Sequence, residues 1–207
     1  MTIRPLLAVV IGLCLVMSGG RSMAAEAGGA TAQVKQVLDR AMEIQTQANL
    51  QGEAHRKERA NLIRRLIDDN FLSKEMARES LSASWGGLSG QQRSEFESLF
   101  ARLFQDSYTR LVLNFLQRET VEYRGETVNK DGTEVTTVIM RANEHIPVNY
   151  QLSQRGQRWH IVDVVIDGVS IVENYKISFG RVIRSSSFSA LLQKMRLQSK
   201  SIQDDIS

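Results

Sequence analysis

The stretch WHIVDVVIDGVSIVENYKISF, residues 159–179, changes character twice along its length. Its first half is rich in Val and Ile and predicts a buried β-strand over residues 158–166. Asp167-Gly168 is typical of a turn, because both residue types tolerate the backbone conformations that turns require. Ser170 and Glu173 then stand in capping-box spacing, directly before an apolar helical pattern. The stretch therefore predicts a strand, a turn and a capped helix.

The polar residues of this stretch also raise the question of a catalytic site. Ser170 resembles the nucleophile of a Gly-x-Ser-x-Gly elbow, but Val172 occupies the position of the second glycine. His160 and Asp163 are candidates for a general base, yet strict alternation along a strand places them on opposite faces, with Asp163 on the face of Ile161. We therefore expect the polar side chains to fix the turn and the start of the helix.

Three further β-rich segments precede this strand. Residues 120–128 contain Val, Thr and Tyr, and residues 133–142 are rich in Val, Thr and Ile. Residues 146–154 alternate between apolar and polar side chains. The connections between them are short, which favours antiparallel pairing of neighbours in the chain. Together with residues 158–166 they predict a twisted, antiparallel, four-stranded meander.

Helical periodicity occupies the rest of the chain. The longest helix is predicted to begin at Ser89, where Gln92 completes a capping box, and to run for about 26 residues. Shorter helices are predicted over residues 31–50, 53–69, 73–81, 170–184 and 187–197. From about Ser199 the tail is polar and is expected to fray. Helices, a meander and helices again predict an α+β fold in which the sheet packs against several helices.

Residues 1–24 have the composition of a cleaved signal peptide. Arg4 gives a positive start, residues 6–17 are apolar, and Ser22-Met23-Ala24 offers small residues for cleavage. The apolar run is shorter than the roughly 20 residues that a membrane-spanning helix needs. The sequence therefore predicts export of a single mature domain over residues 25–207.

The charge of the mature domain is nearly balanced. The chain has 26 Lys and Arg against 23 Asp and Glu, and the leader removes two arginines and no acid. Nucleic-acid binding draws on a basic excess, so no nucleic-acid partner is expected. The only cysteine, Cys14, lies in the leader, which excludes disulfides and thiol chemistry from the mature domain. His55, His145 and His160 have no metal-ligand spacing, and neither a metal nor a cofactor is expected.

Apolar residues occupy both faces of two predicted strands. In residues 158–166, Val162, Val164 and Ile166 point one way by strict alternation, and Trp159, Ile161 and Val165 the other. In residues 133–142, Val135 and Ile139 lie opposite Val138 and Met140. Both faces therefore need cover. A solid core and a ligand cavity use the same residue types, so the pattern alone leaves both open.

Most of the mature chain resembles the family of periplasmic phospholipid carriers typified by MlaC, also called toluene-tolerance auxiliary components. The resemblance extends over about residues 71–197, and the order and spacing of its motifs carry it. These motifs are Phe71, Trp85, Gln91-Gln92-Arg93, Phe96, Tyr108, Tyr150-Gln151-Leu152, Trp159-His160-Ile161-Val162-Asp163-Val164, Asp167-Gly168-Val169-Ser170-Ile171-Val172, Asn174-Tyr175-Lys176 and Phe179.

The resemblance implies a soluble periplasmic carrier without catalytic activity. Such a carrier would move phospholipid between an outer-membrane lipoprotein/porin complex and an inner-membrane ABC transporter with its MCE-domain protein, and so maintain the lipid asymmetry of the outer membrane. The implied fold is a cup of twisted sheet and helices around an apolar cavity. Lys176 stands where arginine is commoner, and relatives of the HpnM type share the pattern, so a hopanoid is an alternative cargo.

On this interpretation we expect acyl chains to lie between the sheet and the long helix. The residues predicted to line that cavity are Phe100, Phe104, Tyr108, Val138, Met140, Val148, Tyr150, Val164 and Ile166. Two other classes remain open at this point. One is an enzyme on the same cup, with Asp163 or His160 as the base acting on an apolar substrate. The other is a periplasmic scaffold with an ordinary solid core.

Overall fold

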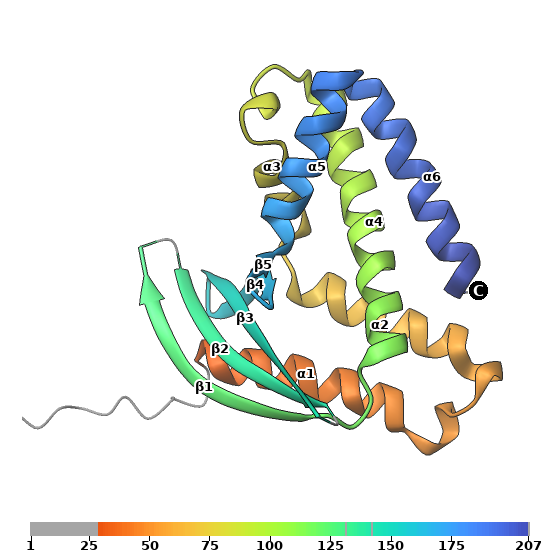
Figure 1. The fold of residues 1–207 in the computed structure, drawn as a ribbon, viewed down its shortest axis with the longest axis vertical. Helices are drawn as coiled ribbons and strands as arrows, with labels where there is room; N and C mark the ends of the chain where they lie inside the picture. The colour runs from red at the N-terminus through yellow and green to blue at the C-terminus, as the bar shows by residue number, and fades with distance from the viewer. Residues whose placement is uncertain (1–28, 131, 142, 207) are drawn as a thin grey trace, which may run out of the picture.

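The computed structural model describes residues 29–130, 132–141 and 143–206, and the predicted leader lies outside them. This part of the chain forms six α-helices and one antiparallel sheet of five strands (Figure 1), which confirms the α+β class. The helices are α1 Ala30–Thr46, α2 Arg56–Asn70, α3 Ser73–Leu81, α4 Gly90–Phe115, α5 Ile171–Ser185 and α6 Phe188–Ile206, with 3₁₀ turns at Ala48–Leu50, Glu53–His55 and Ser82–Trp85. The strands are β1 Thr120–Asn129, β2 Gly132–Arg141, β3 Glu144–Arg155, β4 Arg158–Ile166 and β5 Val169–Ser170.

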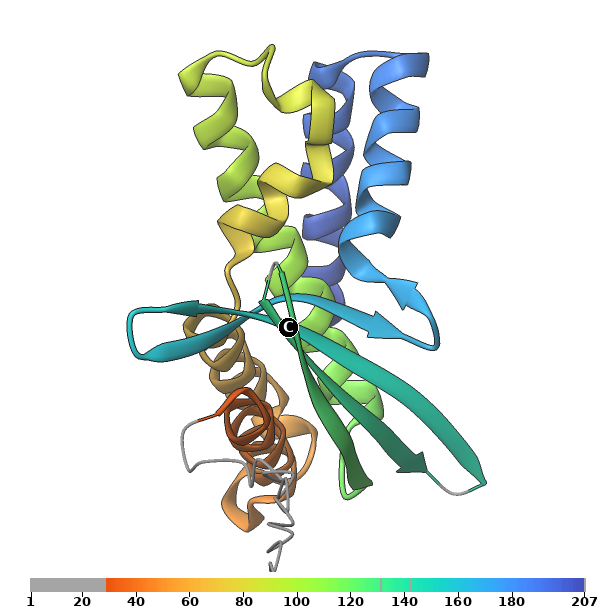
Figure 2. The same cartoon turned by 90° about the vertical axis from the view of Figure 1, so that its left-hand side faces the viewer.

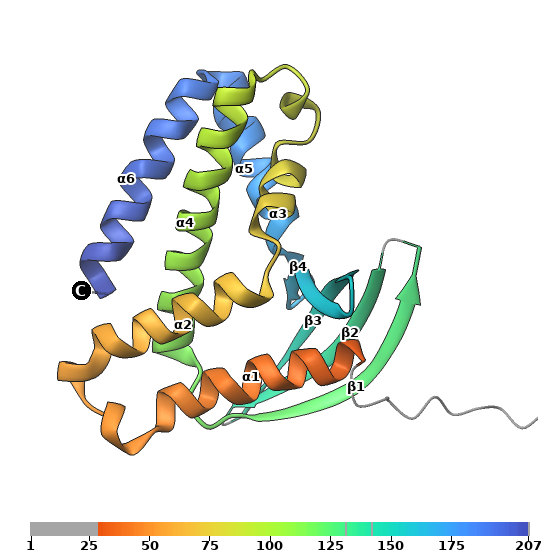
Figure 3. The same ribbon diagram turned by 180° about the vertical axis from the view of Figure 1, so that it is seen from behind.

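Helix α4 stands at the centre of the helical part, where it packs on α2, α3 and α6 and its aromatic rings contact Phe179 of α5 (Figures 1 and 3). Its start is the predicted capping box. The Gln92 N–H donates to the Ser89 hydroxyl at 3.2 Å, and the Ser89 N–H donates to the Gln92 side-chain oxygen at 2.9 Å. Two otherwise unpaired amides at the helix end are thereby satisfied, which fixes where the helix begins.

The sheet has the order β1-β2-β3-β4-β5, with antiparallel pairing throughout, so the predicted meander is confirmed. The predicted number of four strands and the cup shape are corrected to five strands in an open, twisted sheet (Figure 2). Val169 and Ser170 form the additional strand by pairing with Ile166 and Val165. Two residues are too few to show a period of two, so sequence pattern alone missed this strand.

A β-bulge interrupts the alternation of β4. Leu152 of β3 pairs with Ile161, whereas the preceding Gln151 pairs with Asp163, which leaves Val162 as the extra residue. A bulge shifts the side-chain register by one position. Ile161 consequently shares a face with Val164, and the strict alternation predicted across this strand is wrong at that point.

The C-terminal tail is helical rather than frayed. Helix α6 continues to Ile206, and Ser199, Ile202 and Ile206 are buried, so the prediction of a loose tail from about residue 199 is wrong. The reason is a partner on α4. The carboxylate of Asp106 accepts hydrogen bonds from the Ser199 hydroxyl and from the Gln203 amide, both at 2.9 Å.

Helices α1 and α2 cover the sheet from one side (Figure 3). Helix α1 packs on β1, β2 and β4, and its first turn is tied to β1, because the Thr31 amide and hydroxyl both donate to Glu126. The link from α2 to α3 joins β4, since the Leu72 N–H donates to the Ile161 carbonyl at 2.9 Å. Among the described residues no helix combines the length and the apolar run that crossing a membrane would require.

Candidate functional site

An apolar cavity of about 340 Å³ lies between the sheet, the α1–α2 pair and the C-terminal half of α4. This volume falls within the range of about 300–1,000 Å³ typical of ligand pockets. The lining is aliphatic or aromatic apart from one charged residue among those described, Arg141. The cavity is lined by Val37, Leu38, Ala41, Ile63, Leu66, Ile67, Phe71, Tyr108, Leu111, Val112, Phe115, Leu116, Ile139, Arg141, Ile146, Val148, Tyr150, Ile161, Val164, Ile166 and Ile171.

The structure brings together five of the nine residues predicted to line a cavity. They come from α4, β3 and β4, and they are Tyr108, Val148, Tyr150, Val164 and Ile166. Strand alternation explains the four that come from β3 and β4, because Val148 and Tyr150 are two positions apart, as are Val164 and Ile166 beyond the bulge.

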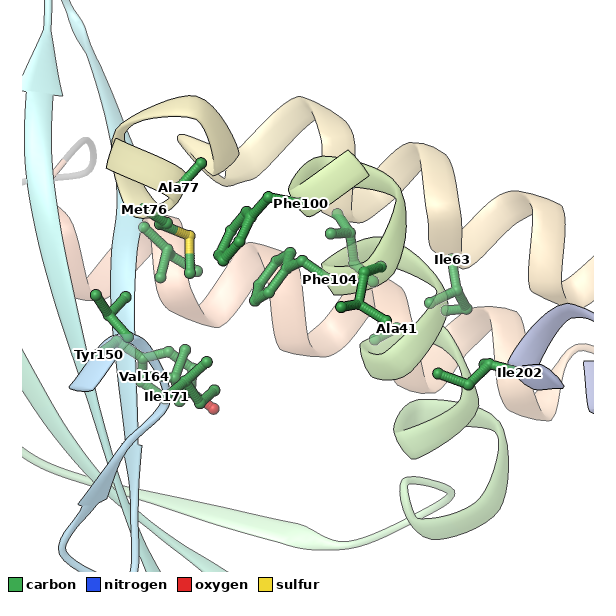
Figure 4. Packing of buried hydrophobic residues seen from close by; sticks show 14 of the residues in the cluster. Ala41, Ile63, Met76, Ala77, Phe100, Phe104, Tyr150, Val164, Ile171 and Ile202 are labelled. Atoms are coloured by element: carbon green, nitrogen blue, oxygen red, sulfur yellow. The ribbon is translucent and has the colours of Figure 1, made fainter. Parts of the chain in front are cut away.

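Phe100 and Phe104 are not part of the lining. Both are fully buried in the helical core, where their rings stack 6.1 Å apart and project from α4 towards Met76 of α3 (Figure 4). Tyr175 packs against Phe100 with a ring separation of 5.2 Å. These two phenylalanines lie one and two turns nearer the start of α4 than Tyr108, and the helices of the bundle enclose that part of the helix.

Val138 and Met140 also lie outside the lining, and β2 contributes Ile139 and Arg141 instead. Residues directly opposite each other in antiparallel strands point to the same face. Ile146 of β3 pairs with Ile139, so the even-numbered face of β3 requires the odd-numbered face of β2. The prediction chose the wrong face of β2, and the pairing register is the signal that identifies the right one.

The largest group that sequence reasoning missed comes from α1 and α2. Both helices have an apolar face, but their periodicity does not say what the face covers. Contact with the sheet is what turns these residues into a wall of the cavity. They are Val37, Leu38 and Ala41 of α1 and Ile63, Leu66 and Ile67 of α2.

A buried glutamine fixes α1 to the end of α4. The Gln45 side-chain amide donates to the backbone carbonyls of Val112, Leu113 and Leu116, at 2.9, 3.1 and 2.9 Å. Carbonyls at the end of a helix lack a partner from a following turn, although the Val112 carbonyl also accepts from the Leu116 N–H at 3.0 Å. Gln45 therefore caps α4 where Leu116 and its neighbours enter the cavity wall.

Two tyrosine hydroxyls lie among the lining residues. Burial raises the pKa of Tyr108, and the nearby Tyr175 and Asp163 raise it further. Burial also raises the pKa of Tyr150, with a smaller upward effect of Tyr123 and a downward effect of the hydrogen bond to Thr137. Both phenols are therefore neutral at physiological pH, and of the described residues that line the cavity only Arg141, at its edge, is charged.

The predicted cap at the start of α5 is present and involves Asp163. The Ser170 hydroxyl accepts from the Glu173 N–H at 3.0 Å and donates to the Asp163 carboxylate at 2.5 Å. The same carboxylate accepts from the backbone amides of Val164 and Val172, at 2.8 and 3.1 Å. Ser170 is thus a helix cap rather than an activated nucleophile, and Asp163 is engaged by three donors at a helix N-terminus, which suits an anion.

The turn predicted before the cap is present and uses a left-handed backbone conformation. Asp167 and Gly168 have φ angles of +49° and +78°, and the Asp167 N–H donates to the Pro147 carbonyl at 2.9 Å. The Glu173 side chain accepts from Lys176 at 3.0 Å instead of returning to Ser170. Of the predicted capping box, the hydrogen bond from the Glu173 N–H to the Ser170 hydroxyl therefore forms, and the Glu173 side chain makes a different contact.

The other candidates for chemistry remain dispersed. His160 does not reach Asp163, and its Nδ1 atom is buried without a hydrogen-bond partner in the described part of the chain. No group of three potential metal-ligating side chains occurs within residues 29–130, 132–141 and 143–206.

The fold and the cavity together define the class: an α+β domain that encloses an apolar space suited to an apolar ligand. The family model described as "MlaC protein" matches residues 35–197, and the chain belongs to this family. A solved structure of a phospholipid-binding protein from Ralstonia solanacearum, in complex with a phospholipid, has the same fold. Its TM-score is 0.69 at 19% sequence identity, with 86% of this chain and 99% of the other covered. Comparison with curated proteins gave no significant match.

Proposed function

We propose that this protein is a periplasmic lipid carrier whose cargo is phospholipid. The observation that carries the proposal is the cavity, because its wall is apolar throughout the interior and reaches the surface at Phe115, which is 52% exposed. A lipid tail needs such a wall and an opening through which the polar head stays in water.

Transfer physics explains why a carrier is needed. Each methylene moved from hydrocarbon into water costs about 0.8 kcal/mol, so a two-chain lipid leaves a membrane unaided at a negligible rate. A cavity of equal polarity removes most of this cost without any covalent step. Membership of the MlaC family and the phospholipid held by the Ralstonia solanacearum protein both support phospholipid as the cargo.

The route of transport is also part of the proposal. We place the carrier between an outer-membrane lipoprotein/porin complex and an inner-membrane ABC transporter with an MCE-domain protein, where it would maintain outer-membrane lipid asymmetry. The predicted leader supports the compartment, and family membership supports the route. An enzymatic role is less well supported, because the candidate base Asp163 is already bound to the start of α5.

The test is to identify lipid in the purified protein. Native mass spectrometry of detergent-free protein is expected to show a bound species, and extraction should yield glycerophospholipid. Val164→Arg places a charge in the cavity wall and should abolish this occupancy. Ile139→Trp fills the cavity without adding a charge and should reduce occupancy as well.

Val128→Arg is the matched control, because Val128 is 79% exposed on β1 and lies outside the lining. It should retain wild-type lipid, and circular dichroism should show all three variants folded. Absence of lipid from the wild-type protein would contradict the carrier proposal. Extraction of a hopanoid instead would keep the carrier and replace the cargo.

A further inference from the structure

A cation lies at the edge of the cavity. Arg141, at the end of β2, is exposed, and it is the only charged residue among the described residues that line the cavity. Its guanidinium carbon lies 5.4 Å from the centroid of the Phe115 ring, which is itself half exposed. The guanidinium thus lies where the apolar wall meets water.

Arg141 has no anionic partner within the described residues. Its cross-strand neighbour is Glu144, yet the two side chains form no ion pair within 4 Å. Arg155, on the neighbouring strand, pairs with Glu75 at 2.6 Å. Arg141 instead resembles Arg102 and Arg181 in having no ion pair among the described residues, and differs from both in lining the cavity. A guanidinium stacked on a ring keeps its N–H edge free, and that edge fits a phosphate with two parallel hydrogen bonds.

We infer that Arg141 binds the phosphate of a lipid whose acyl chains occupy the cavity, an inference that rests on the proposed function. A phospholipid carries its phosphate only a few atoms from its acyl chains, at the boundary between apolar and polar parts. Arg141 and the cavity present the same boundary in the protein. The site therefore selects lipids with a phosphate over neutral lipids with identical tails.

The experiment measures binding of two fluorescent lipids with the same acyl chains, a phosphatidylglycerol and a diacylglycerol, to protein purified from cells expressing the full chain and freed of lipid. Arg141→Gln should weaken phosphatidylglycerol binding by about two- to fivefold, the range expected for an exposed ion pair. It should leave diacylglycerol binding unchanged. Arg102→Gln is the control, because Arg102 is an exposed arginine of α4 outside the cavity lining.

Each other outcome has a distinct meaning. Equal losses for both lipids, or no loss for either, would overturn the role of Arg141 while leaving the carrier intact. Failure of the wild-type protein to bind either lipid would contradict the proposed function itself. Inorganic phosphate should not displace phosphatidylglycerol at low millimolar concentration, and displacement that depends on Arg141 would assign the site to free phosphate.

Discussion

The two halves of the molecule use apolar residues in opposite ways. In the bundle of α3 to α6, aromatic rings fill the interior: Phe96, Phe100 and Phe179 lie with centroids 5.8 to 6.3 Å apart. Between the sheet and α1, residues of similar hydrophobicity leave a space of about 340 Å³. The apolar residues of the bundle form a solid core, whereas those of the sheet half line a cavity.

The difference follows from what covers each surface. Helix α4 belongs to both halves: its first turns lie among the other helices of the bundle (Figure 1), whereas its last turns line the cavity together with the sheet, α1 and α2. The side chains of the twisted sheet, α1, α2 and the last turns of α4 leave a space between them, whereas the rings of the bundle pack against one another. Hydrophobicity therefore predicts burial, and only the local geometry decides between a core and a cavity.

Two leucines of α4 test this comparison most strongly. Leu103 is 1% exposed in the solid half, and Leu103→Ala should lower the free energy of unfolding by about 3 kcal/mol, within the range of 2–5 for such changes. Leu111 is 39% exposed at the cavity, and Leu111→Ala should cost about 1 kcal/mol or less, because its side chain already lacks neighbours on one side.

Urea denaturation of lipid-free protein measures both values, since bound lipid would add its own stabilisation. Equal losses for Leu103→Ala and Leu111→Ala would show that the sheet half is packed as tightly as the bundle. The distinction between core and wall would then fail.

The second test concerns the polar contact that holds the solid half together. Asp106 is 1% exposed and accepts from Arg64 at 3.1 Å as well as from Ser199 and Gln203 on α6. Asp106→Asn keeps the shape but loses the charge and places a donor among donors, which should cost about 1–3 kcal/mol. Hydrogen exchange should rise in α6 before it rises in the sheet.

Ser199→Ala serves as the milder control for this change. It removes one donor and leaves the carboxylate bound to Arg64, so a loss of about 1 kcal/mol is expected. Faster exchange of the cavity wall in Asp106→Asn, with α6 unaffected, would contradict the assignment of Asp106 to the bundle.

Local signals predicted the elements of this fold well. The strand over residues 158–166 and the helix over residues 73–81 have the predicted bounds, and Ser89 caps α4 as expected. In each case the information lies within a few neighbouring residues: a capping pair, a run of β-branched side chains or a turn residue. The resemblance to the MlaC family is confirmed by the match over residues 35–197.

Features that depend on distant contacts could not be predicted in the same way. The bulge at Val162 is a shift in the pairing register between β3 and β4. The face of β2 that lines the cavity follows from the pairing of Ile139 with Ile146 of β3. The tail is ordered by Asp106, nearly a hundred residues away. Phe104 and Tyr108 are one helical turn apart, yet only the second lines the cavity.

The smallest expected effect concerns the seam between α1 and β1. The Tyr123 hydroxyl is buried without a hydrogen-bond partner within the described residues, and the Lys35 ammonium lies 5.9 Å from its ring centroid. Tyr123→Phe removes only this unpaired hydroxyl, so stability at pH 7 should be unchanged or higher by less than about 1 kcal/mol. Thr137→Val is the control, because the buried Thr137 hydroxyl donates to the Val148 carbonyl at 2.8 Å and its removal should cost about 1 kcal/mol.

Alkaline pH gives the same residue a second readout. Burial, with a smaller effect of Asp39, raises the pKa of Tyr123 to about 12, whereas an unfolded tyrosine ionises near pH 10. Between these values the unfolded chain releases a proton that the folded chain retains, so the contribution of Tyr123 to wild-type stability is complete below pH 10 and is lost as the pH rises towards 12.

Urea denaturation at pH 7, 10 and 11 measures this effect. The free energy of unfolding of Tyr123→Phe should fall less steeply with pH than that of the wild type. The difference between the two slopes should stay below the limit of about 1.4 kcal/mol per pH unit, because solvent screens a half-buried site. The slope should persist in part, since burial also raises the pKa of Tyr108 and Tyr150 in the cavity wall. An unchanged slope would mean that Tyr123 is solvated in solution and that the seam between α1 and β1 is open to water.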